Sequence, residues 1–168
     1  MHLRLRPYEA RDEQAARAGH EAMVADHFEF LLYWRPGMEC SAFLADESRR
    51  RRGENLADNE VRSVQLAAVV DGQLVGRTSI RFTLNDFLAH HGGHIDCGVL
   101  PDFRRVGYAS EILRQSLVII RAEAVSPVLV FCDDNNAGSA NVIEHCGGTL
   151  DAVIVDDPAR PLRRYWIH

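Results

Sequence analysis

Residues 94–121 read HIDCGVLPDFRRVGYASEILRQSLVIIR, and this stretch predicts a strand, a turn and a helix in direct succession. Apolar and polar side chains alternate from His94 to Leu100, which is the period of a strand with one polar face. Pro101 ends the strand, and from Ala109 onward apolar residues recur at the spacing of an amphipathic helix. Gly98 has no side chain, so it marks a bulge or a place where another backbone or a ligand comes close.

The turn between this strand and this helix has the composition of an anion-binding site. A turn that leads into a helix N-terminus exposes unpaired N–H groups at the positive end of the helix dipole, which suits a phosphate or pyrophosphate. Gly107 lets an anion reach these amides, and Ala109 keeps the next position small. Arg104 and Arg105 add positive charge. Because the Walker motif and the three-glycine dinucleotide fingerprint are both absent from the sequence, we expect a single-turn phosphate site.

The elements that follow this helix alternate between strand and helix. Residues Val128–Cys132 form a short apolar run typical of a buried strand. A short helix comes next, with Asn136 as its N-cap and Gly147 at its C-terminal end. Two last strands, Leu150–Val155 and Leu162–Ile167, flank a turn-forming insert.

The N-terminal part of the chain predicts one strand, two helical regions and a hairpin. Residues 3–6 alternate as a short strand does, and residues 8–27 are rich in helix formers. An aromatic stretch over residues 28–34 follows. A second helix over residues 40–52 ends in four arginines, which we interpret as a solvated helix end. Residues 64–82 hold two apolar runs joined by Asp-Gly, the pattern of a hairpin.

Composition and charge limit the function classes. Hydrophobic residues make up 46% of the 168 residues and charged residues 26%, which is typical of one folded domain without a long disordered tail. A net charge of -5 argues against a broad surface for nucleic acid or anionic membrane. The chain lacks a signal-peptide pattern at its start, and no stretch approaches the roughly 18 to 20 apolar residues of a membrane span. We therefore expect a cytoplasmic protein.

Cysteine and histidine spacing does not favour a metal site. None of the four cysteines forms a C-x-x-C pair, so reduced thiols are expected at Cys40, Cys97, Cys132 and Cys146. Three histidines lie close to Cys97 in sequence, namely His90, His91 and His94. They would suit a metal ion only with a second ligand pair, and nothing downstream repeats that spacing.

The arginine-rich turn and its neighbours resemble the GNAT N-acetyltransferase superfamily. The signature of that family is Gln/Arg-x-x-Gly-x-Gly/Ala after a strand that ends in Val-x-Pro, and here residues 99–101 read VLP and residues 104–109 read RRVGYA. The family also carries an Asn-x-x-Ser helix start after the next strand, and residues 136–139 read NAGS. The resemblance is strongest over residues 92–148, and it implies a single GNAT acetyltransferase domain over residues 1–168.

The resemblance implies an α+β fold, with a mixed, mostly antiparallel sheet that is flanked by helices and splayed between its fourth and fifth strands. Acetyl-coenzyme A would be the cosubstrate, with its pantetheine in the splay, and no metal is expected. The pantetheine would pair with Gly98, Val99 and Leu100. The pyrophosphate would bind the turn formed by Arg104, Arg105, Val106, Gly107, Tyr108 and Ala109. The other side of the cofactor would touch Asn136 and Ser139.

The activity that the resemblance implies is transfer of the acetyl group to an amine by direct attack in a ternary complex. A proton must then leave the amine, because an ammonium has no lone pair and a lysine-like amine has a pKa of about 10.4. The family often places a glutamate on the strand before the turn, and the matching position here is His94, a suitable proton acceptor. Asp96 lies on the same strand face and is the second candidate, directly or through a water. A purely structural role is the alternative for both residues.

The position of the family's usual acid is occupied by Ile143 instead of tyrosine. Water, Tyr108 or Tyr165 could then protonate the coenzyme A thiolate. The missing tyrosine keeps a second class of function open, a non-catalytic regulatory module that binds coenzyme A or an acyl-coenzyme A. A hydrolase with Ser110 or Cys97 as nucleophile is disfavoured, because the sequence has no Gly-x-Ser-x-Gly elbow and no defined Cys-His arrangement.

The acceptor is not specified by these motifs, because the family contacts it through variable N-terminal helices and C-terminal strands. A small-molecule amine and a peptide amine both remain open. No nucleic-acid or membrane partner is expected. A homodimer through a sheet edge or the C-terminal hairpin would be ordinary for such a domain.

Overall fold

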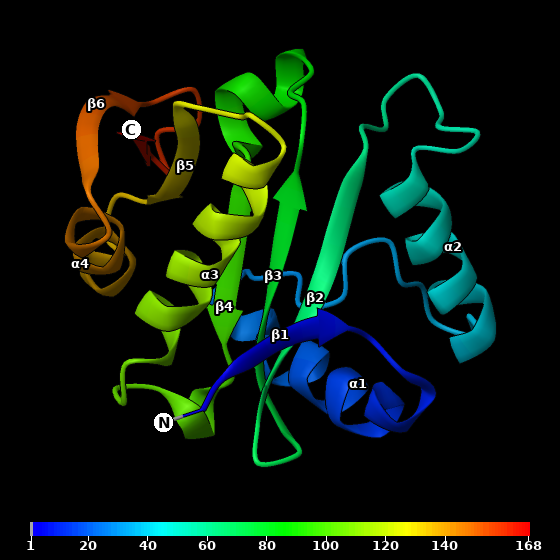
Figure 1. Cartoon of the computed structure of the whole chain (residues 1–168). Helices are drawn as coiled ribbons and strands as arrows, with labels where there is room; N and C mark the ends of the chain where they lie inside the picture. Colours follow the sequence, from blue (N-terminus) through cyan, green and yellow to red (C-terminus); the bar gives the residue numbers. More distant parts are fainter. Residues whose placement is uncertain (1) are drawn as a thin grey trace.

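The computed structural model describes residues 2–168 as a seven-stranded sheet with helices on both faces (Figure 1). The strands are β1 (Arg4–Pro7), β2 (Ser63–Val70), β3 (Gln73–Arg81), β4 (Ile95–Val99), β5 (Val128–Asp133), β6 (Gly148–Ile154) and β7 (Leu162–Ile167). The helices are α1 (Glu13–Ala22), α2 (Cys40–Arg52), α3 (Tyr108–Ala122) and α4 (Ala137–His145). Short helical turns are η1 (Ala10–Asp12), η2 (Val24–Asp26), η3 (Leu88–Gly92) and η4 (Pro101–Phe103).

The strands lie in the order β1-β2-β3-β4-β5-β7-β6. All neighbouring strands are antiparallel except β4 and β5, which run parallel. The expected fold class, a mixed and mostly antiparallel sheet flanked by helices, is therefore confirmed. The sequence did not predict that β7 would lie between β5 and β6, since strand order depends on contacts between distant segments.

Local sequence signals fix the ends of several elements. In the β2–β3 hairpin, Asp71 and Gly72 have φ values of 48° and 83°, and a two-residue turn of this type requires positive φ at both positions. α2 ends at Gly53, whose φ of 70° is the left-handed conformation that terminates helices. α4 begins at Asn136, whose side chain accepts a hydrogen bond from the backbone of Ser139. These three boundaries agree with the predicted ones.

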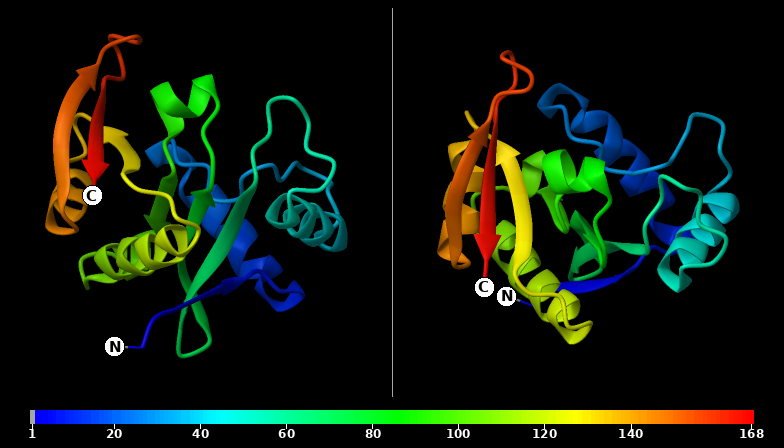
Figure 2. Two further views of the ribbon diagram at one scale, coloured as in Figure 1. Left: turned by 45° about the horizontal axis from the view of Figure 1, so that its top comes forward. Right: turned by 90° about the horizontal axis from the view of Figure 1, so that it is seen from above.

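The two faces of the sheet carry different helices, and the view from above in Figure 2 shows α1 and α3 on opposite sides. Leu113 and Leu117 of α3 pack against Ile80 and Ile95 of the sheet. On the other face, Phe43 of α2, Ala16 of α1 and Phe30 of the segment between these helices belong to a second core. Polar side chains on this second face, between α1, α2 and the sheet, matter most for the candidate site.

The helical region expected over residues 8–27 is present but interrupted, whereas the expectation that the arginine run of α2 is solvated is wrong at Arg50. The helical region over residues 8–27 is divided into η1, α1 and η2, because the buried side chain of Asp12 binds the backbone of Glu9 and so forms a separate turn ahead of α1. The arginines at the end of α2 are not all solvated. Arg50 is buried and forms ion pairs with Asp46 and Glu47 of the same helix, and it is covered by Tyr33 and by Glu60 of the following loop.

Candidate active site

The gap between β4 and β5 is the feature on which the candidate site is built. β3 and β4 share five residue pairs and β5 and β7 share six, whereas β4 and β5 share one, Ile95 with Val130. This pair lies near the amino ends of both strands. Because the strands are parallel, α3 and α4 begin on the side where β4 and β5 end. The sheet therefore opens toward the N-termini of two helices.

His94 closes the narrow end of the gap. Its backbone N–H donates to the Leu129 carbonyl at 2.8 Å, and its Nδ1 accepts from the Leu129 N–H at 2.9 Å. When Nδ1 of a neutral imidazole accepts a hydrogen bond, Nε2 carries the proton. Burial, and secondly the charge of Arg81, lowers the pKa of His94 and favours this neutral form. The predicted role of His94 as proton acceptor is opposed by this bond, since His94 would have to release Leu129 to offer a lone pair.

Asp96, the second predicted proton acceptor, lies on β4 beside a buried arginine. Its Oδ2 is 2.9 Å from Nη2 of Arg77, and its side chain is 34% exposed. The ion pair occupies Oδ2, while Oδ1 has no hydrogen-bond donor within the described part of the chain. Of the two candidates, Asp96 therefore has the more accessible lone pair.

The edge of β4 that faces the gap offers backbone groups to a ligand. The N–H of Leu100 donates to the Val75 carbonyl of β3 at 2.9 Å, so Leu100 is turned away from the gap. Backbone groups of successive strand residues point to opposite edges, so the N–H and carbonyl of Val99 face the gap. The Val99 carbonyl accepts a hydrogen bond from Nε of Arg104 at 3.1 Å. Of the three residues predicted to pair with pantetheine, Val99 is the one whose backbone groups face the gap. The N–H of Leu100 is already bonded.

The predicted phosphate turn leads directly into the N-terminus of α3. Gly107 is the N-cap residue with φ of 90°, and a Cβ at this position would meet no atom within 4 Å. Arg105 also has positive φ, at 67°. The side chains of Arg105 and Val106 are exposed, and those of Tyr108 and Ala109 are partly buried against a core cluster. The arrangement leaves open space next to the first amides of a 15-residue helix.

Arg104 links this turn to the segment that follows α1. Besides its bond to Val99, its guanidinium forms an ion pair with Asp26 in η2. Both side chains are more than one third exposed, so the pair contributes little to stability. An anion at the turn can therefore replace Asp26 at low cost.

The N-terminus of α4 lies across the gap from this turn. Asn136 uses its side-chain oxygen to cap α4 through the Ser139 N–H at 3.0 Å. The Asn136 amide N–H groups and the Ser139 hydroxyl have no partner among residues 2–168 and could contact a ligand.

Three residues bear on the missing acid: Ile143 at its position, and the two tyrosines considered in its place, Tyr108 and Tyr165. Ile143 is buried in the main core. Tyr165 is fully buried and donates its hydroxyl to Glu144 at 2.9 Å. Tyr108 packs beside Phe103 in a smaller cluster. These contacts commit Ile143 and the Tyr165 hydroxyl to the core, whereas the Tyr108 hydroxyl makes no hydrogen bond within residues 2–168.

The four cysteines all carry free thiols. Desolvation raises the pKa of Cys97 to about 12 and that of Cys132 to about 11, so both are protonated near neutral pH. A nucleophilic role for Cys97 is therefore unfavourable.

Among residues 2–168, no group of three or more His, Cys, Asp and Glu side chains is placed to hold a metal ion. None of the helices described is long and apolar enough to cross a membrane.

The loop between β6 and β7 contacts both sides of the gap, which sequence reasoning missed. Arg160 pairs with Asp133 at the end of β5 at 3.0 Å and lies 3.5 Å from the carbonyl of His27. On the other side, Asp156 lies 3.2 Å from His91, just before β4. The turn-forming insert was recognised in the sequence, but no local pattern reports which distant residues it meets.

The register of β3 and β4 shows no bulge at Gly98, and the group that comes close to it is a side chain, not another backbone as expected. The approaching group is the ring of Phe28, which would lie 2.6 Å from a Cβ at this position. Sequence reasoning also missed Arg77, which contacts both this ring and Asp96. A charged residue in the middle of an apolar strand pattern was the available signal.

Comparison with known proteins agrees with this geometry. The profile of the acetyltransferase (GNAT) domain family matches residues 2–149. No curated protein matches the chain. Among solved structures, Mycobacterium smegmatis RimJ with CoA-disulfide is 18% identical, with 98% of this chain and 81% of that chain covered and a TM-score of 0.68. The putative acetyltransferase yncA from Salmonella typhimurium with acetyl-CoA is 15% identical, with 99% and 93% covered and a TM-score of 0.67. Spermidine/spermine N-acetyltransferase SpeG from Vibrio cholerae is 16% identical, with 99% and 94% covered and a TM-score of 0.65.

Proposed function

Because the chain belongs to the GNAT acetyltransferase family, we propose that it transfers the acetyl group of acetyl-coenzyme A to an amine. The observation that carries this proposal is the gap between β4 and β5, which opens toward the turn before α3. An unpaired strand edge suits an extended chain with amide groups, such as pantetheine. The helix N-terminus at the end of that gap suits the pyrophosphate of the same molecule.

The proposed position of the cofactor differs from the predicted one at two residues, Gly98 and Leu100, whose backbone groups do not face the gap. The backbone of Val99 binds pantetheine, while the N–H of Leu100 keeps its bond to β3. Arg104 exchanges Asp26 for a phosphate oxygen, a stronger charge-assisted partner. The amides from Gly107 onward bind the pyrophosphate, and Asn136 at the start of α4 contacts the cofactor from the other side of the gap.

The reaction that we propose is direct attack of a neutral amine on the thioester carbonyl. A C–N bond forms, the C–S bond breaks, and coenzyme A leaves as a thiolate. The proton released by the amine passes to Oδ1 of Asp96, directly or through one water, since Oδ2 is held by Arg77. Water protonates the thiolate, whose ordinary pKa of about 8.5 makes it a fairly good leaving group.

A non-catalytic module that binds coenzyme A is the second candidate. It is favoured by Ile143, which occupies the position of the family's usual tyrosine and is buried in the core. Both candidates predict cofactor binding, and they differ in whether acetyl-coenzyme A is consumed.

A panel assay of free thiol release from acetyl-coenzyme A separates the two candidates. The amines in the panel are polyamines, amino acids, aminoglycosides, lysine side chains and peptide N-termini. Polyamines are included because the similar SpeG structure is that of a spermidine/spermine N-acetyltransferase. Thiol release with one amine class, together with an acetylated product by mass spectrometry, is the expected result. Calorimetric binding of coenzyme A without turnover on any amine supports the binding module, and absence of binding overturns both.

A further inference from the structure

Arg77 lies in the middle of β3 with its side chain fully buried on the face that carries α1 and α2. Transfer of a guanidinium out of water is unfavourable unless ion pairs and hydrogen bonds compensate it. A buried arginine in a central strand therefore requires specific partners, and their identity indicates what the residue does.

Four hydrogen-bond or ion-pair contacts of Arg77 connect two separate segments. Nε donates to the carbonyl of Phe30 at 3.1 Å, and Nη2 donates to the carbonyl of Glu29 at 2.5 Å. Nη1 donates to the carbonyl of Asp96 at 2.8 Å, and Nη2 pairs with the Asp96 carboxylate at 2.9 Å. One guanidinium thus holds residues 29–30 against β4.

Phe28 completes this arrangement. The guanidinium of Arg77 lies 4.2 Å from the centre of its ring, and the same ring rests on Gly98, the residue of β4 opposite Arg77 in the sheet. The absence of a Cβ at Gly98 is required, because one would approach the ring to 2.6 Å. The ring of Phe28 therefore packs against both the Arg77 guanidinium and Gly98.

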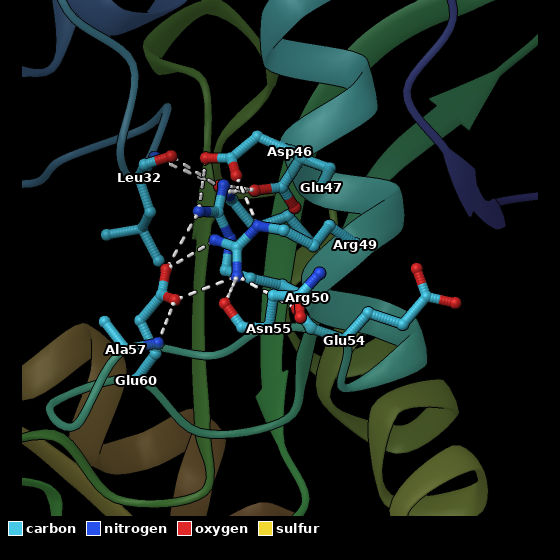
Figure 3. A network of polar contacts seen from close by, with 10 residues as sticks. Leu32, Asp46, Glu47, Arg49, Arg50, Glu54, Asn55, Ala57 and Glu60 are labelled. Atoms are coloured by element: carbon cyan, nitrogen blue, oxygen red, sulfur yellow. Dashed lines mark hydrogen bonds and ion pairs between the residues drawn. The ribbon is translucent and has the colours of Figure 1, made fainter.

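The rest of the segment is anchored by other residues. Leu31 N–H donates to Nδ1 of His20 at 3.1 Å, and Gln65 binds both the N–H and the carbonyl of Leu32 at 3.0 Å. Arg50 stacks on Tyr33, with its guanidinium 4.1 Å from the ring centre. Figure 3 shows Leu32 near Arg50 and its ion-pair partners Asp46 and Glu47. Arg77 is therefore the anchor nearest to β4, and Arg50 is an anchor at the far end.

From these contacts we propose that Arg77 is a positioning residue for the acceptor amine. It fixes the Phe28–Phe30 segment as a wall of the acceptor site and orients the Asp96 carboxylate toward the gap. The inference rests on the proposed function, because it assigns the α1–α2 side of the gap to the acceptor. Arg77 does not contact the cofactor side, where α3 and the phosphate turn lie.

The test compares Arg77→Lys and Phe28→Ala with the wild type, using acetyl-coenzyme A and the amine that gives most turnover in the panel. Lysine keeps a positive charge but cannot bind two carbonyls and a carboxylate at once. We expect the KM for the amine to rise about tenfold or more in both variants, because a displaced wall misplaces the amine. The affinity for coenzyme A should stay within about twofold in both variants, because neither residue contacts the turn before α3.

Arg50→Lys is the matched control, because Arg50 is a comparably buried arginine of α2 that contacts the other end of the same segment, at Tyr33. We expect this variant to lose thermal stability like Arg77→Lys while its KM for the amine stays within about twofold of the wild type. An unchanged KM in Arg77→Lys and Phe28→Ala would overturn the inference. So would an equal rise in Arg50→Lys, which would indicate general loosening of the segment. Lack of turnover by the wild-type protein with every amine would instead reject the proposed function itself.

Discussion

At the scale of single residues, buried polar side chains replace strand pairing where the sheet opens. His94 bonds to both backbone groups of Leu129 and so extends the contact between β4 and β5 by one residue beyond their single pair. Arg77 makes a similar replacement, because it binds carbonyls of a segment without regular structure. In each case the side chain supplies a hydrogen-bond partner to backbone groups that would otherwise be buried without one.

The variant His94→Asn separates the hydrogen bond of His94 with Leu129 from a role of His94 in proton transfer. The Oδ1 atom of asparagine can accept the Leu129 N–H in place of Nδ1, but it cannot take up a proton near neutral pH. We expect His94→Asn to keep kcat within about fivefold of the wild type, measured by steady-state kinetics with the identified amine. His94→Ala should lose about 1–2 kcal/mol of unfolding free energy in denaturant titrations, because Leu129 then lacks its partner.

Asp96→Asn is the comparison for this experiment. It should lower kcat about a hundredfold while leaving the affinity for coenzyme A nearly intact, since the asparagine cannot accept the amine proton. Equal loss of activity in His94→Asn and Asp96→Asn would restore His94 as a participant in proton transfer. Full activity in Asp96→Asn would remove Asp96 from the mechanism.

At the scale of elements, the turn before α3 combines a special backbone with open space. Arg105 and Gly107 both have positive φ, which directs the chain so that the first amides of α3 face outward. Only Gly107 adopts this conformation without strain, and nothing lies within 4 Å of the position that its Cβ would take. Side-chain size alone is therefore tolerated better at this position than negative charge.

Gly107→Glu and Gly107→Ala test this distinction. Both introduce about 1 kcal/mol of backbone strain, but only glutamate places a negative charge where the pyrophosphate is proposed to bind. We expect Gly107→Glu to weaken coenzyme A binding about a hundredfold or more in calorimetry, and Gly107→Ala to weaken it far less. Arg104→Ala should weaken binding by less than about tenfold, because the backbone donors remain. Unchanged affinity in a folded Gly107→Glu variant would place the phosphates elsewhere.

The second element of interest is α2, whose last turn is joined to the following loop by Glu60. Glu60 accepts two hydrogen bonds from Arg49 and one from the Ala57 N–H, as Figure 3 shows. The bonds from Arg49, and then that from Ala57, lower the pKa of Glu60 to about 2 from its ordinary 4.5. The side chain is 15% exposed.

A lowered pKa makes this contact dependent on pH in a defined direction. Its stabilisation is present above the unfolded-state pKa of 4.5 and is lost as the pH falls toward about 2, where the folded protein also becomes protonated. We expect Glu60→Gln to reduce the free energy of unfolding by about 1–2 kcal/mol at pH 7 and by much less near pH 2.5, in urea titrations. Glu54→Gln is the control, because Glu54 pairs with Arg52 while 51% exposed and should have little effect at either pH. A Glu60→Gln effect that is the same at both values of pH would contradict this account.

At the scale of the whole molecule, the sheet consists of two parts that meet at the gap. Strands β1 to β4 form one part and β5, β7 and β6 the other, as seen in both views of Figure 2. They are joined by one strand pair, by His94 and by a shared core that includes Leu117 of α3 and Tyr165 of β7. A ligand that fills the gap would add contacts between the two parts, and its binding energy would stabilise the folded state as a whole.

Amide hydrogen exchange can locate such a ligand on the edge of β4. If pantetheine binds the backbone of Val99, exchange of the Val99 amide should slow about tenfold or more when coenzyme A is added. The Leu100 amide should change less, because it already donates to Val75 in the free protein. Equal slowing at both positions would indicate general stabilisation instead of occupation of the edge, and no change at Val99 would exclude this position of the cofactor.

The sequence by itself determined the local elements and the chemistry of the turn. The strand, turn and helix over residues 94–121, the ends of α2 and the cap of α4 at Asn136 all follow from side-chain period and from capping within a few residues. The family resemblance rests on the same short stretches. These features were predictable because the interactions that create them act between near neighbours along the chain.

The tertiary structure alone decided which distant residues meet at the gap. Arg77 binds carbonyls that lie 47 and 48 residues earlier in the chain, and the loop that contains Arg160 reaches back to His27. The position of β7 between β5 and β6, and the burial of Arg50 in a run of arginines, are decided in the same way. No periodicity reports such contacts, because burial of a charge and pairing of a strand edge depend on what the rest of the fold brings within reach.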